Sequence, residues 1–133
     1  MKKIKKFKIK AHTNATGKLI PFSFNEQFPI KAKRVFFLYG KKNKIRGEHA
    51  HKKCSQLFIP IFGKFILNIK TPKMTKKIVI NHMLKTGVLL PPKYWCGVKF
   101  LNKNSILMVV CDKYYNFNDY LENFNDYKKY LKK

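Results

Sequence analysis

The chain has 133 residues, which is enough for one domain with a hydrophobic core. Hydrophobic residues make up 45% and aromatic residues 15% of the chain, which excludes a disordered protein. No apolar stretch reaches the roughly 18 residues that a membrane span requires. The net charge of +24 invites a nucleic-acid partner, but all except two of the 30 basic residues are lysines spread along the sequence.

The two arginines are Arg34 and Arg46, and arginine is the residue that forks onto bases and phosphates. We therefore expect neither a nucleic-acid nor a membrane partner, but a solvated lysine surface that attracts an anionic substrate. The cysteines Cys54, Cys96 and Cys111 show no C-x-x-C spacing, and the basic N-terminus lacks the apolar core of a signal peptide. We expect reduced, partly buried thiols in a cytoplasmic protein.

Short strands separated by glycine, proline and asparagine dominate the chain. The segment 64–70 alternates, with Phe65, Leu67 and Ile69 on one face. Strands at this spacing predict an all-β sandwich or barrel. The expected strands are 33–39, 56–62, 64–70, 76–82, 88–90, 94–100 and 105–111.

The C-terminus is the only part that predicts a helix, over residues 116–131. Asn116 or Asn118 can cap it, and Asp119 and Glu122 would lie near its positive end. No linker or internal repeat divides the sequence. We expect a single domain over residues 1–133 with a short helical tail.

The stretch Arg46–His51, with the sequence RGEHAH, carries the main chemical signal. His49 and His51 project from the same face of a strand, because side chains alternate across a sheet. Paired imidazoles beside an arginine make a unit that handles protons or binds a metal. Gly47 lets backbone or ligand approach closely.

The spacing His49-x-His51-x4-Gln56-x6-Gly63 resembles the first motif of the cupin superfamily. That motif normally has a carboxylate where this chain has Gln56, and the second cupin motif normally adds a third histidine, which the region 87–98 lacks. With no carboxylate we expect no tightly held metal, and we interpret the histidines as acids and bases.

Several segments together resemble the sugar 3,4-ketoisomerases, small cupins that act on dTDP-4-keto-6-deoxyglucose. The resemblance implies an all-β cupin jelly roll and a 3,4-ketoisomerase that needs no cofactor and serves the biosynthesis of 3-amino-3,6-dideoxy sugars for surface glycans such as lipopolysaccharide. It also implies a homodimer, in which the N-terminal strand would be a candidate for exchange. The resembling segments are 17–21, 33–36, 46–51, 90–95 and 109–120.

In such a reaction a proton leaves C3, an enediol forms and a proton reaches C4. We expect His49 and His51 to act jointly as the acid/base pair. Both arginines are candidates for the diphosphate, although Arg34 could instead pair with a carboxylate. The other predicted substrate-binding residues are Gln56, Trp95, Tyr39 and Lys99, to which Tyr94 adds a ring that could stack on sugar or thymine.

Each of these roles has a simpler structural reading. Gln56 could only satisfy buried backbone, and Trp95 could belong to the core or to a dimer interface. Two other functions stay open at this point. One is a metal-dependent cupin of the epimerase or dioxygenase type, and the other is a non-catalytic module that binds sugar nucleotides or nucleic acid.

Overall fold

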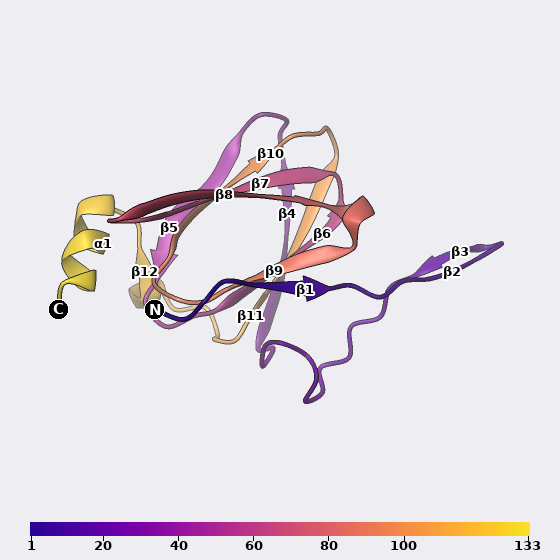
Figure 1. Ribbon diagram of the computed structural model, residues 1–133, viewed down its shortest axis with the longest axis horizontal. Helices are drawn as coiled ribbons and strands as arrows, with labels where there is room; N and C mark the ends of the chain where they lie inside the picture. Colours follow the sequence, from indigo (N-terminus) through magenta and orange to yellow (C-terminus); the bar gives the residue numbers. More distant parts are fainter.

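Two antiparallel sheets of five strands each lie face to face in the computed structural model, which describes residues 1–133 (Figure 1). The strands from β4 to β7 alternate between the two sheets, which is the connectivity of the predicted cupin jelly roll. The first sheet has the order β1 (Lys5–Lys8), β9 (Thr86–Leu90), β6 (Gln56–Phe62), β11 (Ser105–Cys111) and β4 (Arg34–Gly40). The second has the order β12 (Tyr120–Leu121), β5 (Ile45–His51), β10 (Trp95–Phe100), β7 (Lys64–Thr71) and β8 (Met74–Asn81).

The main core lies between the sheets and follows from the alternation of the strands. Phe65, Leu67 and Ile69 of β7 are fully buried, as the sequence predicts, and they pack in one cluster with Phe100 and Leu107. A second cluster lies on the outer face of the first sheet. There the N-terminal residues Ile9 and Ile30 are among those that cover strands β6 and β11.

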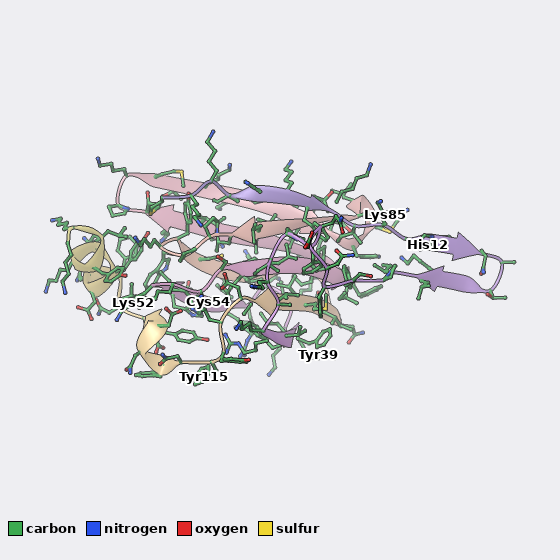
Figure 2. All side chains as sticks on the ribbon, turned by 90° about the horizontal axis from the view of Figure 1, so that it is seen from below. His12, Tyr39, Lys52, Cys54, Lys85 and Tyr115 are labelled. Carbon is green, nitrogen blue, oxygen red and sulfur yellow. The ribbon has the colours of Figure 1, made fainter.

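The N-terminal segment covers the body and then leaves it. Strand β1 pairs with β9 of the same chain. The hairpin of β2 (His12–Asn14) and β3 (Gly17–Leu19) then projects from the body with every residue exposed, as His12 shows in Figure 2. A 3-10 turn at His82–Leu84 joins β8 to β9, and the backbone N–H of Gly63 donates to Nδ1 of His82 over 2.9 Å.

The predicted helix over 116–131 is wrong for its first half. A 3-10 turn occupies Phe117–Asp119, β12 follows it, and helix α1 spans only Phe124–Leu131. The reason is tertiary, because β12 pairs with the end of β5 and the Asp119 side chain accepts hydrogen bonds from the loop after β5. Asn123, not Asn116 or Asn118, caps α1 by accepting from the N–H groups of residues 125 and 126. No helix is long and apolar enough to cross a membrane.

Candidate active site

A β-bulge in β5 sets the direction of the functional side chains. His49 lies opposite Cys96 on β10, whereas Gly47 lies opposite Gly97, so Glu48 is the extra residue. Gly47 and Glu48 both have positive φ, +94° and +52°. Strict alternation would place Arg46 on the face opposite His49. Because the bulge inserts one residue, Arg46 lies on the same face as His49 and His51. All three side chains line the same cavity.

That cavity opens between the sheets and has a volume of about 420 Å³, within the range of small-molecule sites. Most of its walls are apolar, and its polar groups are few and concentrated. Of the residues predicted to bind substrate or catalyse the reaction, it brings together His49, His51, Arg46, Arg34 and Gln56.

The two imidazole rings converge in this cavity. Their centroids lie 5.1 Å apart, and the ring of Tyr120 contacts both, at 5.0 Å from His49 and 4.4 Å from His51. Nδ1 of His51 lies 3.0 Å from Oδ2 of Asp119. An ionised carboxylate only accepts, so Nδ1 of His51 carries the proton and donates it to Asp119. Nε2 of His51 is therefore left as a lone-pair acceptor, and it is buried without a protein partner.

Burial keeps both imidazoles neutral. It lowers the pKa of His51 to about 4, even though the hydrogen bond to Asp119 acts in the opposite direction. Burial also lowers the pKa of His49, against the opposing effect of a hydrogen bond to the backbone of Gly47. In the protein without substrate, the pKa of each imidazole therefore lies below the ordinary value for histidine. At pH 7 the pair is thus present as two bases.

Arg34 lies across the cavity from the histidine strand, on β4. Its Nη2 donates to the hydroxyl of Tyr120 and to Sγ of Cys111, each over 3.5 Å. The guanidinium lies over the rings of Phe36 and Tyr115 at 5.4 and 5.5 Å. Its Nε is buried with no partner, so one donor remains available in the wall of the cavity. No carboxylate pairs with Arg34, contrary to the alternative noted from the sequence.

Three residues predicted to bind substrate do not line this cavity. Trp95 points to the opposite face of β10 and packs against Phe124 and Tyr127 of α1. Tyr39 is 71% exposed on the outer face of β4, and Figure 2 shows it at the periphery. Lys99 lies four residues after Trp95 on β10, so its side chain is on the same face of the strand and likewise points away from the cavity.

Other residues at the cavity had weaker signals in the sequence. Tyr94 lines it in place of its neighbour Trp95, and its hydroxyl donates to the backbone carbonyl of Lys2 over 2.7 Å. The sequence predicts Asp119 as part of a helix start, not as the partner of His51. The only sequence feature that indicated a role for Asp119 in the site is its position, next to Tyr120, at the end of the segment 109–120 that resembles the sugar 3,4-ketoisomerases.

The donor atoms here do not favour a tightly bound divalent metal. Ligand atoms of His51, Cys54 and Asp119 lie within 4.8 Å of one another. The Asp119 carboxylate, however, already accepts from His51 and from the backbone of Lys53 and Cys54. A hydrogen bond to Cys111 and burial raise the pKa of Cys54, so its sulfur is protonated and a poor ligand. On the cavity side, His49, His51 and Gln56 supply no carboxylate.

Comparison with known proteins assigns the chain to a family. The family described as "FdtA: WxcM-like, C-terminal" matches residues 2–132. The chain belongs to this family. One FdtA/WxcM-like relative, the TDP-4-oxo-6-deoxy-alpha-D-glucose-3,4-oxoisomerase of Aneurinibacillus thermoaerophilus, is 26% identical over 121 residues, which cover 90% of this chain and 86% of that protein.

Solved structures agree with this FdtA/WxcM-like assignment. QdtA, a sugar 3,4-ketoisomerase from Thermoanaerobacterium thermosaccharolyticum solved with TDP, is 28% identical, with a TM-score of 0.89 over 97% of this chain and 94% of that chain. A histidine-to-asparagine variant of QdtA was solved with TDP-4-keto-6-deoxyglucose; it is 27% identical, with the same TM-score and coverage. These findings confirm the predicted family, the cupin fold and the 3,4-ketoisomerase activity of its relatives.

Proposed function

We propose that this protein is an isomerase that converts TDP-4-keto-6-deoxyglucose into its 3-keto isomer. The observation that carries this proposal is the pair of neutral imidazoles in one cavity, with Nε2 of His51 buried and unpartnered and its Nδ1 fixed by Asp119. The names of the relatives supply the substrate class. The geometry supplies the acid/base groups that such a reaction requires.

The reaction moves a carbonyl from C4 to C3 and needs no external electrons. A base removes the proton from C3, the enediolate forms, and an acid returns a proton to C4. Protons also move between the two oxygens. Two rings 5.1 Å apart can serve adjacent carbons and their oxygens, so His49 and His51 act jointly in these transfers. Asp119 keeps His51 in one tautomer and stabilises the imidazolium that forms when His51 accepts a proton.

The two arginines hold the anionic part of the substrate. Arg46 is exposed at the cavity and forms no ion pair, so its guanidinium is available to phosphate oxygens. Arg34 offers its unpartnered Nε inside the same cavity. Gln56, buried beside Arg34, is placed to hydrogen-bond a sugar hydroxyl, and the ring of Tyr94 replaces Trp95 as the candidate for stacking on sugar or thymine.

The active form of the protein is a homodimer. Strand β4 is an edge of its sheet, and its outer face presents an apolar stripe of Val35, Phe37 and Tyr39, exposed by 42%, 49% and 71%. Such a stripe on an unpaired edge favours pairing with a second chain. The β2–β3 hairpin projects from the body of the chain (Figure 1), and we infer that it also contacts the second chain.

A cytoplasmic location fits the three buried, unpaired thiols. The 3-keto product would carry the carbonyl at the carbon that an amino group must reach, which fits the proposed role in the synthesis of 3-amino sugars for surface glycans.

The direct test mixes the purified protein with TDP-4-keto-6-deoxyglucose and follows the sugar by NMR. The expected result is a new 3-keto-6-deoxyhexose species that appears without added metal or nicotinamide cofactor. Binding of TDP with no conversion under any condition would instead identify a non-catalytic sugar-nucleotide module. Conversion that disappears on treatment with a chelator and returns with a metal would identify the metal-dependent alternative.

A further inference from the structure

The two walls of the cavity differ in chemistry. The side chains that can gain or lose a proton share the wall formed by the second sheet. They are His49 and His51 on β5, Cys96 on β10 and Tyr120 on β12. The first sheet faces them across the cavity (Figure 1), and most of its lining side chains are apolar. They include Phe36, Leu38, Phe58, Leu90 and Val109.

The remaining polar groups of the cavity do not supply a second site of proton transfer. The first sheet contributes Arg34, whose guanidinium stays charged, and the neutral amide of Gln56. Two hydroxyls come from loops. That of Tyr94 donates to the backbone carbonyl of Lys2 over 2.7 Å, and the side chain of Tyr115 is 63% exposed. Proton transfer inside the cavity is therefore confined to the wall of the histidines.

We infer that both proton transfers occur on one face of the sugar, so that the product has the galacto configuration at C4. This inference rests on the proposed function, because it takes TDP-4-keto-6-deoxyglucose as the substrate. In the enediol intermediate both C3 and C4 are planar. The face from which C4 receives its proton then decides whether O4 becomes axial, as in galactose, or equatorial, as in glucose.

The position of Arg46 indicates which face of the sugar meets the histidines. In the chair of an α-linked D-gluco nucleotide sugar, the diphosphate oxygen at C1 and the hydrogens at C3 and C5 are axial on the same face, the α face. Arg46 lies on β5 together with His49 and His51 and lines the same cavity. A diphosphate held by Arg46 therefore turns the α face, with the hydrogen at C3, towards the imidazoles. Arg34 agrees with this orientation, because its Nη2 reaches the hydroxyl of Tyr120 on the histidine wall over 3.5 Å.

The reaction then balances on the α face alone. An imidazole takes the hydrogen at C3 as a proton, the C3–H electrons form the C3–C4 double bond, and O4 gains a proton. The hydroxyl at C3 next loses its proton, the carbonyl forms at C3, and the electrons of the double bond take up a proton at C4 from the histidine wall. In total one proton moves from C3 to C4 and one from O3 to O4.

The direction of this last step sets the configuration. A hydrogen that arrives at C4 on the α face pushes O4 to the opposite face, which is its axial position in galactose. The gluco isomer needs a proton donor at the β face of the sugar. There the wall is formed by apolar side chains such as Phe36 and Phe58, which cannot donate one.

The configuration of the product tests the inference directly. The protein converts TDP-4-keto-6-deoxyglucose, and the 3-keto product is analysed by proton NMR at early times, before chemical epimerisation. We expect the small H4–H5 coupling of an equatorial H4, as in the galacto isomer. The large coupling of trans-diaxial H4 and H5 would show the gluco isomer and overturn the inference, while the isomerase proposal would stand. A protein that forms no 3-keto product would contradict the proposed function instead.

A binding experiment tests the orientation of the sugar without any turnover. The probe is TDP-6-deoxy-α-D-glucose, which has no carbonyl and cannot isomerise. In the complex, H3 and H5 of the sugar should show NOEs to imidazole protons, and these NOEs should be lost in His49→Asn or His51→Asn. His82→Asn removes an imidazole outside the cavity and should keep them. NOEs from the imidazoles to H2 and H4, which are axial on the β face, in place of H3 and H5 would overturn the inference.

Discussion

At the scale of single residues, burial and one carboxylate decide what the histidine pair can do. The cavity removes water from both imidazoles, which keeps them as neutral bases. Asp119 then selects which nitrogen of His51 carries the proton. The histidines could be found from the sequence because their spacing is local. Asp119 could not, because it lies 68 residues away from His51 and only the tertiary fold joins them.

Asp119→Asn tests whether Asp119 fixes the tautomer of His51. The amide keeps the shape but can present N–H to Nδ1 of His51, which favours the wrong tautomer and does not stabilise the imidazolium. We expect kcat to fall by roughly 10²–10³, within the usual range for general acid–base catalysis, with little change in TDP affinity. Steady-state kinetics and calorimetric titration with TDP measure both. An unchanged kcat in the folded variant would remove Asp119 from the mechanism.

The neutral state of His51 also predicts how stability depends on pH. Its pKa is about 4 in the folded protein against an ordinary 6.5, so between these values the unfolded chain binds more protons. The free energy of unfolding should therefore decrease as pH falls from 6.5 to about 4, by roughly 3 kcal/mol from this residue. Urea unfolding of wild type and His51→Asn across this window measures it, and the variant should show the shallower slope. Equal slopes would contradict burial of a neutral imidazole.

At the scale of elements, the sequence predicted the strands well and the tail poorly. Residues 105–111 and 56–62 were predicted with their observed bounds, because apolar runs closed by glycine, asparagine or proline define them locally. The start of the tail instead pairs with β5, and no helical period in the sequence reports such a partner. The bulge at Gly47 was equally hidden, although it places Arg46 and the histidines in one cavity.

Gly47→Ala tests the bulge. Gly47 has φ +94°, and an added Cβ would lie 3.2 Å from the backbone oxygen of Cys96, so the local backbone must shift. We expect a loss of about 1–3 kcal/mol in unfolding free energy and a raised KM, because Arg46 moves with the bulge. Gly17→Ala is the matched control: Gly17 also has positive φ, but its Cβ would meet nothing within 4 Å. Equal effects of the two substitutions would show that φ alone, not the bulge contacts, matters.

At the scale of the whole molecule, charge and the apolar stripe on β4 bear on the proposed dimer. Only six carboxylates face 30 basic residues, and no lysine or arginine forms an ion pair with any of them. Most lysines are therefore solvated, as expected, and they create a positive field for an anionic substrate. Like charge also opposes self-association, so a dimer must rely on apolar contacts such as those offered by Val35, Phe37 and Tyr39.

The double variant Phe37→Glu with Tyr39→Glu tests the proposed dimer. Charges on the stripe should shift the molar mass measured by light scattering from that of two chains to that of one. Val79→Glu, on β8 at similar exposure to Phe37, is the control and should leave the mass unchanged. A wild-type protein that is monomeric at every concentration would contradict the dimer.

Asparagine variants of His49 and His51 test whether these two residues perform the proton transfers. Turnover of TDP-4-keto-6-deoxyglucose by His49→Asn and His51→Asn should fall by at least about 10²-fold, with TDP binding and the far-UV spectrum retained. His82→Asn removes an imidazole that does not line the cavity and should turn over like wild type. Wild-type turnover in either active-site variant would contradict the account.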